Sequence, residues 1–471
     1  MDLLERFRTP RSTIVDRRCA SYVLMGTLFV SSAAFADDRE APPPHVRGSA
    51  DDASATSPTP DFVPDPTAGN QVSLAGILAF ADEHSPVLAV ARSTRSRAEA
   101  ERVAASILLP TNPDVYVAAG PRFGISGTGV DVDVSVLQQI QIGGVRRRRI
   151  DAADRFADLT DAEIERMRWA VHTDVHAAFH RALVDQERVR LAARVVTFQQ
   201  EVLHFAERVA AAGETAPLTL RLARAEVAQS EQVLIAAEQT FLASRIRLAQ
   251  LSGWPVTNPP TPGGNVDEPR DPQPFEQLMA IAGERLPAVI AAVARVREAE
   301  ARVALADREG LPRPSVGFQF RREGNPTSEG PYNIYLGLVS VPIPLFQRNQ
   351  GDRARARAEL EVAEAELGSI RQLLGAQIAE ARSEMVAAAA RTRTYGTEIL
   401  PRFEENLTLL RRSFELGEID ILALSTGRER FLRIQSDALG AQQDYFVALA
   451  GLQRVVGVDL FHDVHDVETT P

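Results

Sequence analysis

The chain has 471 residues, of which 45% are hydrophobic and 24% are charged, and its net charge is −11. This balance is typical of a folded protein, and an acidic chain is a poor candidate for binding nucleic acid. All 52 basic residues are arginines, which excludes mechanisms that need a lysine, such as a Schiff base or a P-loop.

Residues 1–36 have the pattern of a secretory signal peptide. A basic start with several arginines precedes an apolar run, and Ala34-Phe35-Ala36 comes before Asp37 as a signal-peptidase site would. An uncleaved anchor is the alternative, although the run is short for a bilayer span. The single cysteine, Cys19, lies before the run, so the exported chain is expected to lack disulfides and thiolate metal sites. No later segment is apolar for long enough to predict a transmembrane helix.

The rest of the chain divides into two similar halves. Residues 37–70 are rich in proline, serine and aspartate, which predicts an extended or disordered tether. Beyond it, the spacings between prolines and between glycines recur after about 200 residues, which indicates an internal duplication. The expected parts are a first repeat at 71–253, a proline-rich linker at 254–274, a second repeat at 275–460 and an acidic tail at 461–471.

Each repeat is expected to carry a helix, about 86–109 or 287–310, that runs into a proline and is followed by two strands. In VDVDVSV, Val130 to Val136, valines alternate with Asp and Ser, so one face is apolar and the other polar. The other expected strands are DVYVAAG from residue 114, SVGFQF from 315 and YNIYLGLVSV from 332. Glycine- and proline-rich segments between them indicate hairpin connections.

Each repeat then becomes helical for a long distance. Residues 150–212 contain no proline or glycine, and at 1.5 Å per residue they would extend for roughly 90 Å. The second copy runs from about 353 to 416 and has apolar residues three and four apart, which predicts a coiled-coil seam. That seam comprises Leu360, Ala363, Leu367, Ile370, Leu374, Ile378, Ala381 and Met385. Helices this long need neighbouring helices along their whole length.

Four strands with one apolar face suit a wall between lipid and water, although an ordinary half-buried sheet is the alternative. Four strands cannot close a barrel, and an unpaired edge is not tolerated in lipid. Two chains would supply eight strands and three would supply twelve, enough for a water-filled lumen. Long helices continuing the strands would extend such a lumen as a tube.

These features resemble the TolC family of outer-membrane efflux ducts over residues 71–460. The resemblance rests on the duplicated order of elements, on the joins LQQIQIGGVRRRRIDAA and VSVPIPLFQRNQGDRARA, and on the turns AAGETAPLTLRLARAE and ELGEIDILALSTGRE. VPIPLFQRNQG looks most like the heavy-metal, CzcC-like branch. The implied fold is α+β, mainly α: duplicated helical hairpins form a periplasmic α-barrel, and four strands per chain join a trimeric 12-stranded outer-membrane β-barrel.

The resemblance also implies a function and partners. The chain would be a passive duct in which a homotrimer meets a periplasmic adaptor (membrane fusion) protein and an inner-membrane resistance-nodulation-division pump. Heavy-metal cations are the cargo implied by the branch. No cofactor is expected, and no nucleophile–base–acid constellation indicates an enzyme. A periplasmic adaptor or a structural coiled-coil envelope protein remains the alternative.

The two breaks in the long helices are interpreted as hairpin turns at the periplasmic tip. Glycine ends a helix at low cost, proline suits a first helical turn, and aspartate caps a helix start. In the family these turns close the channel and contact the adaptor. The residues expected at the turns and the docking surface are Gly213, Glu214, Pro217, Leu218, Gly417, Glu418, Asp420 and Leu422.

The aperture is expected to depart from the family, in which acidic side chains beyond the second turn surround the closed opening. Here that stretch is ILALSTGRER, so an acidic ring is not evident. We expect Arg428 to be held by carboxylates, with Glu226 and Glu429 as partners across adjacent hairpins. A solvated Arg428 on the outer face is the alternative. The aperture candidates are Arg224, Glu226, Thr426, Arg428 and Glu429.

Three histidines recur on one face of the first long helix. His172, His176 and His180 have the i, i+4, i+8 spacing of metal ligands. A polar helix stripe facing water is the preferred interpretation, so no firm metal site is predicted. The arginine run 146–149 is interpreted as a cationic collar near lipid or lumen rather than a nucleic-acid patch.

Overall fold

The computed structural model describes residues 71–109, 111–124, 127–211, 217–264, 268–324, 331–416 and 418–461. All of them belong to one compact unit, Thr59–Pro471, and a second unit, Met1–Pro58, lies outside them. The predicted signal peptide, the predicted tether and the acidic tail beyond residue 461 therefore fall outside the described residues.

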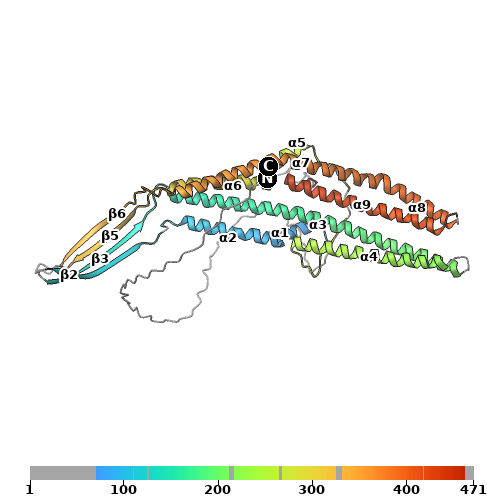
Figure 1. The fold of residues 1–471 in the computed structure, drawn as a ribbon, viewed down its shortest axis with the longest axis horizontal. Helices are drawn as coiled ribbons and strands as arrows, with labels where there is room; N and C mark the ends of the chain where they lie inside the picture. The colour runs from blue at the N-terminus through green and yellow to red at the C-terminus, as the bar shows by residue number, and fades with distance from the viewer. Residues whose placement is uncertain are drawn as a thin grey trace, which may run out of the picture. The chain divides into compact units, whose positions relative to one another are not determined.

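The described chain runs through the same order of elements twice (Figure 1). The first copy comprises α1 (Leu74–His84), α2 (Pro86–Ser106), β2 (Asp114–Gly124), β3 (Gly127–Gln139), α3 (Val145–Ala211) and α4 (Pro217–Ser252). The second comprises α5 (Phe275–Arg285), α6 (Pro287–Glu309), β5 (Ser315–Glu323), β6 (Tyr332–Ser340), α7 (Gln350–Thr394), a π-helical turn at Tyr395–Ile399, α8 (Leu400–Glu415) and α9 (Ile421–Val456). The predicted duplication is confirmed element by element.

The repeat extends to the residues that end the helices. Gly253 follows α4 and Gly457 follows α9, with φ of 80° and 87°. A side chain at Gly253 would overlap the carbonyl oxygen of His84, and a Cβ at Gly457 would lie 2.6 Å from the Cα of Leu286. Each glycine thus lets the long helix end against the junction of two shorter ones, in a conformation that other residues rarely adopt.

The four predicted strands form one antiparallel sheet with the order β2-β3-β5-β6. Val134 pairs with Val117 on one side and Phe320 on the other, so these side chains share a face. Asp133 pairs with Ala118 and with Arg321 on the opposite face. The alternation predicted from the sequence is confirmed for β2, β3 and β5, but it was wrong for β6, which carries apolar residues on both faces. β2 and β6 are the edge strands.

The helices form a layer that continues from the sheet. α2 packs on α3, α3 on α6 and α6 on α7, and farther from the sheet α3 packs on α4 and on α9. In Figure 1 the strands lie at one end of these helices, and the last residues of α3, the first residues of α4 and the junction of α8 with α9 lie at the other. Two apolar cores stabilise the layer, one around Ile77, Phe80 and Trp254, the other around Leu278 and Ile378.

The predicted coiled-coil seam of α7 is confirmed by the burial of its residues. Ala363, Leu374, Ile378, Ala381 and Met385 are all buried. Leu360, Leu367 and Ile370 are half-buried on the same side, because residues three and four apart lie on one helix face.

Three local features differ from the sequence expectations. The linker contributes to the fold, because Thr261–Pro262 forms a short parallel strand with Gln71–Val72 and Trp254 is buried. The second long helix contains the π-helical turn, which the first lacks. The stretch Leu74–Ser106 is long and apolar enough to count as a candidate membrane span by length and composition. Its ion pairs Arg95–Asp161, at 2.9 Å, and Arg102–Asp154, at 2.9 Å, instead join it to α3.

Candidate functional site

The expected docking residues lie at the turns between long helices, as far as the structure describes them. Pro217 is the first residue of α4, and Leu218 beside it is 65% exposed. Asp420 caps α9, since its carboxylate accepts a hydrogen bond of 2.8 Å from the backbone N–H of Ala423. The N–H of Glu418 donates to the carbonyl oxygen of Ser413 at 2.9 Å. Gly213, Glu214 and Gly417 lie outside the described residues, as does the side chain of Leu422.

Two of the aperture candidates make ion pairs within their own hairpins. Arg224 on α4 lies 3.4 Å from the carboxylate of Glu207 on α3. Glu429 lies 3.7 Å from Arg433, one turn later on α9. Both pairs are well exposed and contribute little to stability individually.

Arg428 occupies a different environment, between the two hairpins. Its guanidinium carbon lies 3.0 Å from the centroid of the Phe198 ring on α3, and its Nη2 lies 3.5 Å from the carbonyl oxygen of Arg194. Burial lowers the pKa of the Arg428 guanidinium to about 10, while the carboxylate of Glu201 opposes that shift and Arg411 adds to it. The group is therefore still charged at neutral pH. The alternative of a solvated Arg428 does not describe this half-buried side chain.

A cavity of about 760 Å³ lies beside Arg428, between α3, α4 and α9. Glu226, Thr426 and Glu429 line it together with Arg428, so four of the five aperture candidates meet there. Within this chain Arg428 contacts the ring of Phe198 and the backbone of α3, rather than the carboxylate of Glu226 or Glu429. The sequence could not show this, because Phe198 is separated from Arg428 by a whole repeat.

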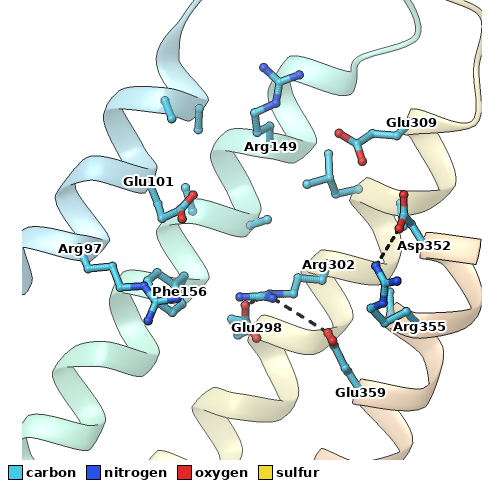
Figure 2. A pocket seen from close by; sticks show the side chains of 17 residues that line it. Arg97, Glu101, Arg149, Phe156, Glu298, Arg302, Glu309, Asp352, Arg355 and Glu359 are labelled. Atoms are coloured by element: carbon cyan, nitrogen blue, oxygen red, sulfur yellow. Dashed lines mark hydrogen bonds and ion pairs between the residues drawn. The ribbon is translucent and has the colours of Figure 1, made fainter. Parts of the chain in front are cut away.

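A second hollow, of about 370 Å³, lies near the sheet and is lined by α2, α3, α6 and α7 (Figure 2). Because these four helices pack side by side in that order, a hollow shared by all of them lies on the concave side of the layer. Figure 2 shows Glu101, Arg149 and Glu309 around its open centre. Arg302 is joined to the buried Glu298 and lies 4.0 Å from Glu359.

The arginine run at the start of α3 has two structural roles. Arg146 donates a hydrogen bond of 2.8 Å to the carbonyl oxygen of Ser106, which ends α2. Arg149 lines the concave hollow. The arginine run therefore lies at the junction of strands and helices, where Arg146 secures the end of α2, and its role as a cationic collar stays a prediction.

The three histidines do not form a stripe facing water, so that interpretation was wrong. His176 and His180 are only 4% and 5% exposed. The His180 ring stacks on Phe446 of α9 with centroids 4.0 Å apart, and His172 lies 3.9 Å from Asp459. Among the residues that the structure describes, no group of three or more His, Cys, Asp or Glu side chains has the geometry to hold a metal ion.

Comparison with known proteins agrees with this arrangement. The family model of the outer membrane efflux proteins matches residues 80–254 and 278–458. The chain is 27% identical to the cobalt-zinc-cadmium resistance protein CzcC of Cupriavidus metallidurans over 68% of this chain and 75% of that one. It is 24% identical to the pyoverdine export outer membrane protein OpmQ of Pseudomonas putida, over 70% and 71%.

The fold agrees with a solved channel at much lower identity. The outer membrane channel CmeC of Campylobacter jejuni superposes with a TM-score of 0.65 at 12% identity, covering 83% of this chain and 88% of that one. The matched residues include both repeats, which decides against the alternatives of an adaptor or a structural coiled coil. The chain belongs to the outer membrane efflux protein family, whose members are TolC-like channels of the outer membrane with a large periplasmic portion.

Proposed function

We propose that three copies of this chain form one passive duct across the outer membrane. The sheet carries this proposal, because β2 and β6 have no further strand beside them among the described residues. Its Val- and Phe-rich face needs apolar surroundings, and strand edges in lipid must be paired. If β6 of one copy pairs with β2 of the next, three sheets close as a barrel of about twelve strands.

The helical layer then surrounds the periplasmic part of the duct. Its concave side faces the axis, so the hollow near the sheet lines the lumen. The ends of the α3–α4 and α8–α9 hairpins point away from the membrane, where Leu218 is available to an adaptor protein. The adaptor connects the duct to an inner-membrane pump of the resistance-nodulation-division class, which supplies the energy.

Heavy-metal cations are the proposed cargo, from the likeness to the cobalt-zinc-cadmium resistance protein. The concave hollow supports transit rather than capture, because its carboxylates alternate with guanidiniums such as Arg302 and Arg355. A passive duct benefits from weak wall contacts, since a tight metal site would slow release.

Fractionation and light scattering test the assembly. The protein should be found in outer membranes and elute from detergent as a trimer, and a stable membrane-embedded monomer would refute the shared barrel. Deleting the gene should raise sensitivity to cobalt, zinc or cadmium, and the intact gene should restore resistance. Unchanged sensitivity to all three metals would refute the proposed cargo without affecting the trimer result.

A further inference from the structure

β6 differs from the other strands because both of its faces are apolar. Val339 pairs with Val316, and Tyr335 pairs with Phe320, on the face that carries the valines of β3. The opposite face of β6 carries Ile334, Leu336 and Leu338, which we name the inner strip. A strand with one face toward lipid and one toward water has no need of apolar residues on both.

The register places the inner strip beside charged residues. Leu336 pairs with Gln319 and Ile334 with Arg321, and both partners bind Asp133 of β3. The strip therefore lies on the polar face of the sheet, and Leu336 is 41% exposed there.

Gly317 of β5 lies between the inner strip and Leu137 of β3. Gly317 pairs with Leu338 on one side and with Leu137 on the other, and a Cβ at Gly317 would lie 3.1 Å from the Cγ of Leu137. With no side chain between them, the two leucines border one apolar surface.

The surrounding charge favours a cation. On the polar face the four strands carry the carboxylates of Asp114, Asp131, Asp133 and Glu323 against the guanidiniums of Arg122 and Arg321. Four against two leaves a net charge of −2 per copy. Arg122 lies 2.9 Å from Asp131 and 3.4 Å from Glu323, and Arg321 lies 3.0 Å from Asp133, so two guanidiniums face four carboxylates and the excess charge is acidic.

We propose that the inner strip is a cargo-contact site in the barrel for amphipathic organic cations, a substrate class distinct from bare metal ions. The inference rests on the proposed trimeric duct, in which the polar face lines the lumen. The apolar groups of the cargo contact Leu336 and Leu338, and its charge is balanced by the acidic excess. Three strips, one per copy, line the barrel.

Single-channel recording in planar bilayers tests this site with tetrabutylammonium as the probe. Each buried methylene changes affinity by about fourfold, so tetrabutylammonium should block at a concentration at least about tenfold lower than tetramethylammonium. Butanesulfonate, an amphipathic anion, should not block. Equal block by the two ammonium ions, or equal block by the sulfonate, would overturn the proposal.

Two variants on one strand provide the matched comparison. Leu336→Ala should weaken tetrabutylammonium block by at least about fourfold, whereas Val339→Ala, on the opposite face, should leave it unchanged. Unchanged block in Leu336→Ala, or equal weakening in both variants, refutes the site. If Leu336→Ala instead dissociates the trimer on gels, the strip packs the seam between copies and the proposal is also wrong. No current in either the wild-type protein or the Arg428→Glu variant, which should open the closed end, would refute the duct itself.

Discussion

Arg428 of α9 lies over the ring of Phe198 of α3, with 3.0 Å between the guanidinium carbon and the ring centroid. The contact joins the second hairpin to the first within one chain. It is sheltered, because Arg428 is half-buried and its pKa is lowered by that burial. A cation held on an aromatic face and partly removed from water contributes about 1–2 kcal/mol. The two hairpins are thereby held together at the end of the molecule where a duct would close.

Reversing the charge should loosen this closure. Arg428→Glu removes the cation–π contact and brings the new carboxylate toward Glu201, so the closed arrangement loses about 1–2 kcal/mol and the open population rises by about five- to thirtyfold. Resting conductance in planar bilayers measures the change. Phe198→Leu keeps the apolar bulk and should give a smaller increase.

Arg433→Glu is the matched control for that charge reversal. Arg433 lies on the same helix but is exposed, and it lies 3.7 Å from Glu429. The resting conductance of the Arg433→Glu channel should stay at the wild-type level. Equal conductance in Arg428→Glu and the wild type would show that the gate lies elsewhere.

Replacement of Leu218 should separate docking from folding. Leu218→Asp places a charge on a residue that is already exposed in the chain, so trimer formation and membrane insertion should persist. Export should be lost, because the proposed contact with the adaptor would lose an apolar anchor and gain a carboxylate that must be desolvated. Leu218→Met retains an apolar side chain and should export normally. Wild-type export by Leu218→Asp contradicts the docking assignment.

Added divalent cations should block the wild-type channel only weakly. The stretch after the second turn offers Ala423, Thr426 and Arg428 rather than a ring of carboxylates, and Glu429 is already paired with Arg433. A divalent ion needs several oxygen ligands to bind tightly. Titrating magnesium and zinc against single-channel current measures this, and strong block at micromolar concentration would show that carboxylates surround the aperture after all.

Local patterns predicted the elements well because the elements are decided locally. The valines of β3 and the seam from Ala363 to Met385 were correctly placed, since periods of two and of about three and a half fix which side chains share a face. The helix cap at Asp420 was correctly predicted for the same reason.

Contacts between segments far apart in the sequence could not be predicted from local patterns. His180 has the spacing of a solvated stripe, but Phe446 of α9 covers it. Arg428 was expected to pair with nearby carboxylates, but within this chain its guanidinium packs on the ring of Phe198 in the other repeat. The inner strip was present in the sequence of β6, but its meaning depends on the pairing of Leu336 with Gln319, which only the sheet register provides.

Gly253 and Gly457 occupy equivalent positions in the two repeats, so replacing either one by alanine should lower stability by a similar amount. Gly253 and Gly457 have nearly the same φ and end equivalent helices, each against the backbone at an equivalent helix junction. Alanine at either position must adopt a left-handed conformation and also displace that backbone, so each variant should lose at least about 1–2 kcal/mol of stability.

Thermal unfolding followed by circular dichroism in detergent measures these losses, and Gly283→Ala is the control. Gly283 lies inside α5 with no atom within 4 Å of a built Cβ, so alanine there should be neutral or stabilising by up to about 1 kcal/mol. Gly253→Ala and Gly457→Ala should both melt below the wild type, by similar amounts. If only one variant melted below the wild type, the two helix ends would not be equivalent. If neither variant did so, the close approach of the backbone at these glycines would not constrain the fold.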